Sequence, residues 1–188
     1  MTRYEALKAL HVITSIIWIG AGFLIAVLVR RAEAAGDRER QVAYQADVSW
    51  LSTRLFIPTS LAVFILGILT AIDGNWSFSQ PWISIGFAGY LVSFGLGILF
   101  FKPQSERIGE LVEQDGPNNA EAGRLMARVN IVERFQLLVL FIVVADMVVK
   151  PTSDDSGTLI VGGALVALAG LLALAALRRV SPDTSSAS

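Results

Sequence analysis

Four long uncharged stretches constrain this chain more than any other feature of its sequence. A helix needs about 20 mostly apolar residues to cross a hydrocarbon core of ~30 Å, because each residue adds only ~1.5 Å. The uncharged stretches are residues 9–29, 55–72, 76–101 and 157–177. They predict four membrane-spanning helices.

A fifth, shorter apolar run lies at residues 135–145. Extended to residues 131–149 it reaches the length of a span, but it then includes Glu133, Arg134 and Asp146. Charges near the ends of a span can reach the headgroups or pair within a bundle. We therefore predict a fifth span here, between the third and the last.

The composition agrees with a chain embedded in a lipid bilayer. Apolar residues make up 54% of the sequence and charged residues 16%, against roughly 25% charged in an average soluble domain. The formal net charge of -1 gives no basic field for nucleic acid, and we predict no nucleic-acid partner. The sequence has no cysteine, which excludes disulfides, thiolate metal sites and iron–sulfur clusters from this chain.

The distribution of Lys and Arg predicts the orientation. Five arginines lie between the first two spans, and one lysine and three arginines lie between the third span and the predicted fourth. The opposite links, residues 73–80 and 150–157, carry no basic residue and one lysine. Because basic residues accumulate on the cytoplasmic side, we expect a multi-pass protein of the plasma or inner membrane, with its N-terminus outside and its C-terminus in the cytoplasm.

The expected fold is all-α, a polytopic membrane bundle with a four-helix core and a fifth C-terminal transmembrane helix. Residues 1–151 would form the four-span bundle with helical cytoplasmic extensions, 152–179 the fifth helix and 180–188 a disordered tail. Residues 37–54 lack Pro and Gly, so this helix is expected to start in the cytoplasm and run into the membrane. Small residues are expected where helices pack closely; examples are Gly22, Gly67, Gly89 and Gly95.

His11 is the only histidine and lies inside the first span. Ionisable residues within a membrane are costly, which favours a functional role. Ser15, Trp18 and Gly22 follow at helical spacing and suggest a face that packs into the bundle. Three interpretations stay open: His11 ligates a haem or a metal, it relays protons, or it hydrogen-bonds to another helix or lies among the headgroups.

Two further pairings of side chains are hypotheses. A haem ligated by His11 requires a second ligand, and Met147, on the same side of the membrane, is a candidate because thioethers serve as axial ligands; a second copy of the chain could instead supply its own His11. On the cytoplasmic side, Arg54 and Glu133 enter neighbouring spans. An Arg54–Glu133 ion pair would hold these helices in register.

Several segments carry a resemblance to a known family. They are residues 7–12 (LKALHV), 18–22 (WIGAG), 30–32 (RRA), 54–58 (RLFIP), Gly67, 75–78 (NWSF) and 81–83 (PWI). With these segments the chain resembles, over residues 7–151, the bacterial family of predicted integral membrane proteins known as domain of unknown function 2269. The shared part has about four spans, which implies that the last helix is an addition.

A more remote resemblance is to the HemJ-type protoporphyrinogen oxidases and the CopD-type copper-resistance membrane domains. It rests on a histidine in a Lys-Ala-x-His context, residues 8–11, and on the approach from Arg54 to Pro58. In the first group a histidine of the first helix is implicated in haem binding, which by position implies His11 here.

These observations leave three hypotheses about function. The first is an integral membrane protein that binds haem or takes part in redox chemistry through His11. The second is a small transporter or permease subunit, and the third is a non-catalytic assembly factor or partner protein. In each case the lipid bilayer is the environment, and a homo-oligomer is consistent with all three.

Overall fold

The computed structural model describes residues 1–180, and every regular element in them is helical. The predicted tail, residues 180–188, lies outside the described residues except for its first. The helices are α1 (Arg3–Ala34), α2 (Arg38–Leu51), η1 (Ser52–Phe56), α3 (Ile57–Asp73), α4 (Pro81–Leu96), η2 (Gly97–Phe101), α5 (Lys102–Asp115), α6 (Ala120–Val149) and α7 (Ser156–Val180).

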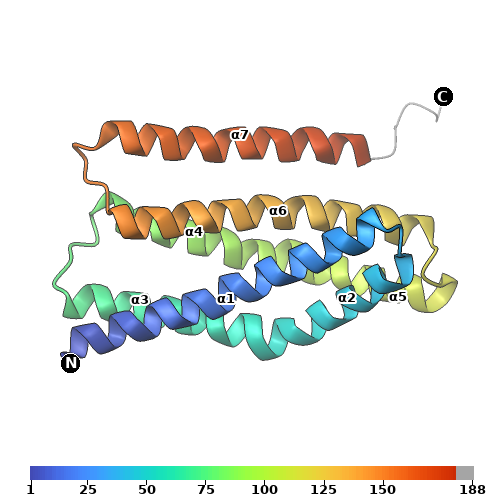
Figure 1. The fold of residues 1–188 in the computed structure, drawn as a ribbon, viewed down its shortest axis with the longest axis horizontal. Helices are drawn as coiled ribbons and strands as arrows, with labels where there is room; N and C mark the ends of the chain where they lie inside the picture. The colour runs from blue at the N-terminus through green and yellow to red at the C-terminus, as the bar shows by residue number, and fades with distance from the viewer. Residues whose placement is uncertain (181–188) are drawn as a thin grey trace.

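The long helices lie side by side along one direction (Figure 1). Helix α1 packs mainly on α3, and α6 packs on both α4 and α7. Helix α7 lies at one side of the bundle against α6, as Figure 1 shows. The prediction of an all-α membrane bundle with a C-terminal helix at its side is confirmed.

Within residues 1–180, four helical stretches are long and apolar enough to cross a membrane: Arg3–Ala34, Arg38–Asp73, Pro81–Asp115 and Ser156–Val180. The second confirms that the polar helix at residues 38–51 continues into the apolar run; its start in the cytoplasm stays a prediction. Helix α6 is 30 residues long and lies among the others, but the charges of Glu133, Arg134 and Asp146 set it apart from these four. A crossing by α6 therefore stays a prediction.

The stretches Arg38–Asp73 and Pro81–Asp115 each contain a π-helical turn that ends two residues before a proline. The turn η1 precedes Pro58, and η2 precedes Pro103. Proline has no N–H to donate and its ring meets the carbonyl four residues earlier, so the helix locally widens to the i→i+5 pattern. The helices therefore pass through both prolines without ending.

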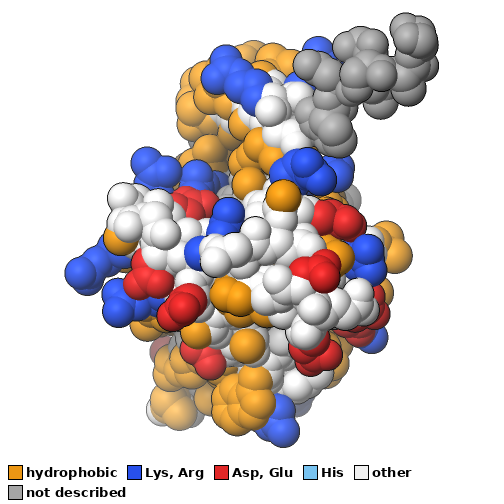
Figure 2. Space-filling model, turned by 90° about the vertical axis from the view of Figure 1, so that its right-hand side faces the viewer, with side chains coloured by type: hydrophobic (Ala, Val, Ile, Leu, Met, Phe, Trp, Pro, Cys, Tyr) orange, Lys and Arg blue, Asp and Glu red, His pale blue; other side chains and the backbone are white. Residues whose placement is uncertain are grey.

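The most compact core lies at the end of the bundle where α5 meets α6. Its buried residues are Ile108, Leu111, Ala122, Met126 and Val129. In the spans, by contrast, many large apolar side chains are exposed on the bundle surface, where lipid tails rather than water would surround them. Figure 2 views this end of the molecule, and both basic and acidic side chains gather on it. We call this end, formed by α2, α5 and the start of α6, the charged cap; hydrophobic burial is concentrated there.

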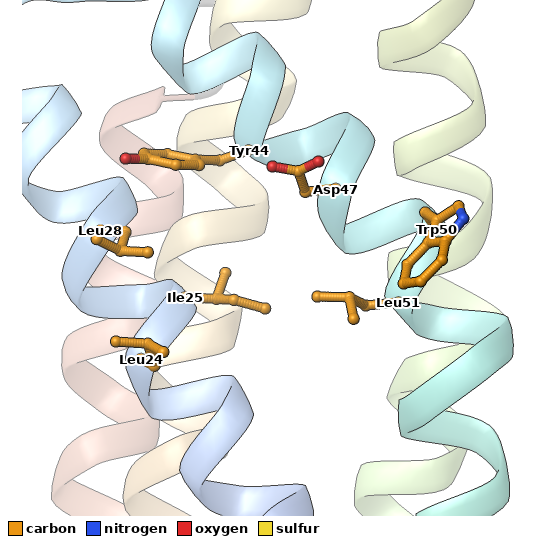
Figure 3. A pocket seen from close by; sticks show the side chains of 7 residues that line it. All are labelled: Leu24, Ile25, Leu28, Tyr44, Asp47, Trp50 and Leu51. Carbon is orange, nitrogen blue, oxygen red and sulfur yellow. The ribbon is translucent and has the colours of Figure 1, made fainter.

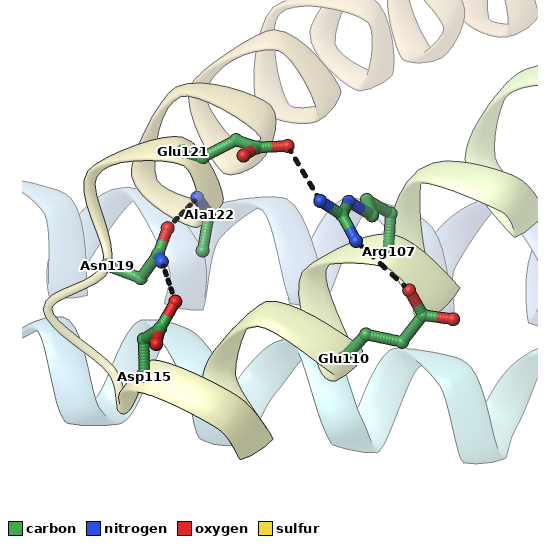
Figure 4. A network of polar contacts seen from close by, with 6 residues as sticks. All are labelled: Arg107, Glu110, Asp115, Asn119, Glu121 and Ala122. Atoms are coloured by element: carbon green, nitrogen blue, oxygen red, sulfur yellow. Dashed lines mark hydrogen bonds and ion pairs between the residues drawn. The ribbon is translucent and has the colours of Figure 1, made fainter.

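Polar contacts stabilise the turn between α5 and α6 (Figure 4). Arg107 binds both Glu110 and Glu121 at 3.3 Å, and these hydrogen bonds raise the pKa of Arg107. Asn119 caps α6 by accepting from the Ala122 N–H at 2.9 Å and donates to Asp115. The turn is thus held from both helices.

Glu33 at the end of α1 joins α1 to α6. Its carboxylate accepts from Asn130 Nδ2 at 2.6 Å and forms an ion pair with Arg134. In residues 1–180, the predicted Arg54–Glu133 ion pair is not formed; the Arg54 guanidinium lies over the Trp50 ring, 4.7 Å from its centroid. Helix α1, rather than the second span, supplies the charged partner of α6, and the charges are reversed: Glu33 of α1 pairs with Arg134 of α6.

Glycines bring α4 and α6 together. A Cβ at Gly89 would lie 2.5 Å from Val143 Cγ2, whereas a Cβ at Gly95 would meet no atom within 4 Å. The expectation of close packing is therefore confirmed at Gly89 and wrong at Gly95. Because valine is stiff at χ1, Val143 cannot easily move aside.

We predict opposite effects of alanine at these two glycines of α4. Gly95→Ala should leave the melting temperature in detergent unchanged or raised, because alanine favours a helix over glycine by roughly 0.5–1 kcal/mol. Gly89→Ala should lower it, because overpacking costs roughly 1–3 kcal/mol. Equal shifts in the two variants, measured by tryptophan fluorescence on heating, would contradict the close packing of α4 on α6.

Removing the Glu33 carboxylate should destabilise the protein by roughly 1–3 kcal/mol, because it leaves the buried amide of Asn130 and the Arg134 charge without their acceptor. The test compares Glu33→Ala with Glu39→Ala, which removes an exposed carboxylate on α2. Thermal unfolding in the same detergent should show a loss only for Glu33→Ala. Matching unfolding curves for the two variants would mean that this contact between α1 and α6 does not contribute to stability.

Candidate functional site

A cavity of about 800 Å³ lies between α1, α3, α4 and α6. Most of its lining is aliphatic or aromatic, and His11 and Met147 both line it. It extends to the end of the bundle where the N-terminus, the α3–α4 link and the α6–α7 link lie in Figure 1. This end is opposite to the charged cap.

His11 is fixed in the cavity wall by a bond between helices. Its Nδ1 lies 2.9 Å from the carbonyl oxygen of Val63 in α3. A carbonyl can only accept, so Nδ1 carries the proton. In residues 1–180, Nε2 has no hydrogen-bond partner, which leaves its lone pair available.

Gly67 makes this contact possible. It lies one turn after Val63, and a Cβ at Gly67 would be 3.1 Å from His11 Cε1. A larger side chain would crowd the imidazole away from the Val63 carbonyl. The prediction that Gly67 lies at a close helix contact is confirmed, and its neighbour is the histidine itself.

The hydroxyl groups beside His11 are satisfied within α1. Ser15 Oγ donates to the His11 carbonyl at 2.7 Å, and Thr14 Oγ1 donates to Leu10 at 2.8 Å. Such bonds to the preceding turn hide the hydroxyl groups from an apolar environment. The imidazole differs from these hydroxyl groups because, within residues 1–180, its Nε2 has no hydrogen-bond partner.

Aromatic rings form much of the remaining wall. Phe64 and Tyr90 are stacked with ring centroids 4.7 Å apart, and Phe87 meets Phe64 edge to face at 5.7 Å. Trp18 lies 6.1 Å from Tyr90. Helix α3 supplies Phe64 and α4 supplies Phe87 and Tyr90, so contacts between aromatic side chains of these two helices form this surface.

Met147 reaches the cavity from α6. Its methyl carbon lies 1.9 Å from where a Cβ of Gly86 would be, so Met147 occupies the space that this glycine leaves. The structure thus brings the two predicted cofactor residues, His11 and Met147, to one cavity. In residues 1–180 no three His, Cys, Asp or Glu side chains lie together as a metal site.

A smaller hollow of about 310 Å³ lies between α1 and α2. Figure 3 shows Leu24, Ile25 and Leu28 of α1 facing Leu51 and Tyr44 of α2 across it. Asp47 contributes the one acidic side chain of the lining. Its lining contains no imidazole or thioether, so it offers fewer groups that could ligate the metal of a cofactor than the larger cavity does.

The His11 contact predicts a single tautomer. Because His11 is the only histidine, protein labelled with 15N-histidine gives the signals of one imidazole. We expect Nδ1 protonated and Nε2 unprotonated at neutral pH. A protonated Nε2 with an unprotonated Nδ1 would contradict the contact with Val63.

The comparisons with known proteins place the chain in a family. None of the curated proteins or solved structures compared with it matches. A family model described as "Predicted integral membrane protein (DUF2269)" matches residues 5–151, from α1 through the end of α6, and leaves α7 outside. This range agrees with the resemblance over residues 7–151 and contains every residue that lines the cavity except Tyr4. The chain belongs to the DUF2269 family of predicted integral membrane proteins.

Proposed function

We propose that this membrane protein binds a haem-type tetrapyrrole in the cavity, where His11 Nε2 would ligate the iron, and takes part in redox chemistry. The observation that carries the proposal is the orientation of the imidazole. Histidines that bind metals almost always donate their other ring N–H to a carbonyl or carboxylate, which fixes the ring and its tautomer. The contact from His11 Nδ1 to Val63 is of this kind.

The cavity suits a large, planar and mostly apolar group. Its volume of about 800 Å³ lies within the range of roughly 300–1,000 Å³ that is typical of ligand sites. The rings of Phe64, Phe87 and Tyr90 offer flat apolar surface. Met147, on the same cavity, is the candidate for a second axial ligand, and the alternative is His11 of a second copy in a homo-oligomer.

Haem and the protein would contribute different parts of the chemistry. Haem supplies a one-electron couple when it is bound. His11 would hold the iron, Gly67 and Val63 would keep the imidazole in place, and the apolar wall would exclude water. Weakly hydrated surroundings and the identity of the axial ligands are the chain's means of setting a reduction potential.

The proposal includes the predicted orientation, with the cavity at the outer face of the plasma or inner membrane and the charged cap in the cytoplasm. The links at the charged cap carry more Lys and Arg than the links at the opposite end, and this difference supports the orientation. It also includes five crossings, since α6 lies along the bundle beside α4 and α7.

The two other functions have less support. Transport requires a polar path, and the buried polar side chains of residues 1–180 are Ser60, Ser93 and Asn130, which lie on different helices. A role as an assembly factor would use the charged cap in Figure 2. Reconstituted vesicles and co-purification, respectively, test these alternatives.

Protein purified in mild detergent from haem-supplemented cells should show a Soret band, and His11→Ala should lose it. Val148→Ala, which shortens another residue of the cavity wall but removes no ligand, is the matched control and should keep the band. A colourless wild-type protein, or a His11→Ala variant with the same band, would refute the proposal.

A further inference from the structure

We propose that the ligand of this cavity is an amphipathic anion whose acidic group binds between Lys8 and Lys150 at the outer rim. The inference deepens the proposed function, because it assigns a charge and a direction of entry to the occupant of the same cavity. The carboxylates of a tetrapyrrole or the headgroup of an acidic lipid share this chemistry.

The placement of the lysines is selective. The sequence has three lysines, and two of them, Lys8 and Lys150, line the cavity. Lys8 comes from the first turns of α1, whereas Lys150 follows the last residue of α6. Two segments distant in sequence therefore bring positive charge to one apolar opening.

Both ammonium groups lie over aromatic rings. Lys150 Nζ is 4.6 Å from the centroid of the Trp76 ring and 5.2 Å from that of Trp82. Lys8 Nζ is 5.1 Å from the Tyr4 ring centroid. Such contacts are attractive and hold the charges at the rim, but they leave N–H donors free for an anion.

Neither charge is neutralised within the part of the chain that the structure describes. No carboxylate lies within 4.0 Å of Lys8 or Lys150 there, whereas the third lysine, Lys102, pairs with Glu106. The one acid–base pair at this end joins Arg3 to Asp73 at 3.2 Å. An apolar cavity with two unpaired cations at its opening is complementary to an anionic amphiphile.

The backbone gives a second, independent indication. Lys150 has φ 52° and ψ 58°, a left-handed conformation that favours glycine or asparagine. A lysine there costs roughly 1 kcal/mol relative to glycine. The cost is understandable if the side chain is needed at the rim, since this conformation ends α6 and turns Lys150 onto Trp76 and Trp82.

The test uses two pairs of probes that differ in one feature, the free acid. The first pair is metal-free protoporphyrin and its dimethyl ester, and the second is a brominated fatty acid and its methyl ester. Both pairs quench tryptophan fluorescence, and Trp18, Trp76 and Trp82 line the cavity. Without iron, binding does not depend on coordination by His11.

Affinities are measured in uncharged detergent for three proteins. The rim variant is Lys8→Gln/Lys150→Asn, in which asparagine suits the left-handed position 150. The control is Lys102→Gln at the opposite end of the protein. We expect the rim variant to bind an acid roughly tenfold more weakly than wild type does, the esters to bind both proteins alike, and the control to match wild type.

The outcomes separate this inference from the proposed function. An acid-specific loss of binding in the rim variant supports the rim; with the porphyrin pair it also supports the tetrapyrrole, and with the fatty-acid pair alone it identifies an acidic lipid as the ligand of the rim. Acids that bind wild type and rim variant equally, or a failure of all four probes to bind, would overturn the rim. The tetrapyrrole proposal depends on iron and His11, so the Soret band of the purified protein decides it separately.

Discussion

The hydrogen bond between His11 and the Val63 carbonyl is the interaction on which the account of the cavity depends. Lipid offers no hydrogen-bond partner, so an imidazole inside a span must find its partner in the protein. The nearest helix can provide one only where its backbone is accessible, and Gly67 gives that access. The bond thereby joins α1 to α3, selects the tautomer and leaves Nε2 without a hydrogen-bond partner among residues 1–180.

The two ends of the bundle hold their charged side chains in different ways. The end formed by α5 and α6 faces water in our account, so it buries a small apolar core and pairs its charges, as in the contacts of Arg107 with Glu110 and Glu121. At the other end Lys8 and Lys150 are held by aromatic rings. A ligand that is apolar in its body and acidic at one edge would use both the cavity and this rim.

Much of the fold could be predicted from the sequence, because uncharged runs of 18 residues or more have few alternatives to a membrane span. Gly67 and Gly89 were recognisable as interface residues. Gly95 was misjudged, since composition gives no indication of which side of α4 faces α6.

The predicted Arg54–Glu133 pair is not formed for a related reason. The prediction assumed which helices are neighbours, whereas Glu33 of α1 is the partner of Arg134 in α6. His11 and Met147 were identifiable as candidates, whereas the roles of Lys8, Lys150 and Phe64 depend on how four helices meet.

The most direct test of the central claim is pulsed electron paramagnetic resonance on oxidised protein grown with 15N-histidine. Since the chain has one histidine and the nitrogens of a tetrapyrrole stay unlabelled, any strong 15N hyperfine coupling to iron identifies His11. The account predicts that coupling from the directly bound nitrogen. A haem signal without 15N coupling would place the iron elsewhere, and protein without a haem signal would return His11 to a purely structural role between α1 and α3.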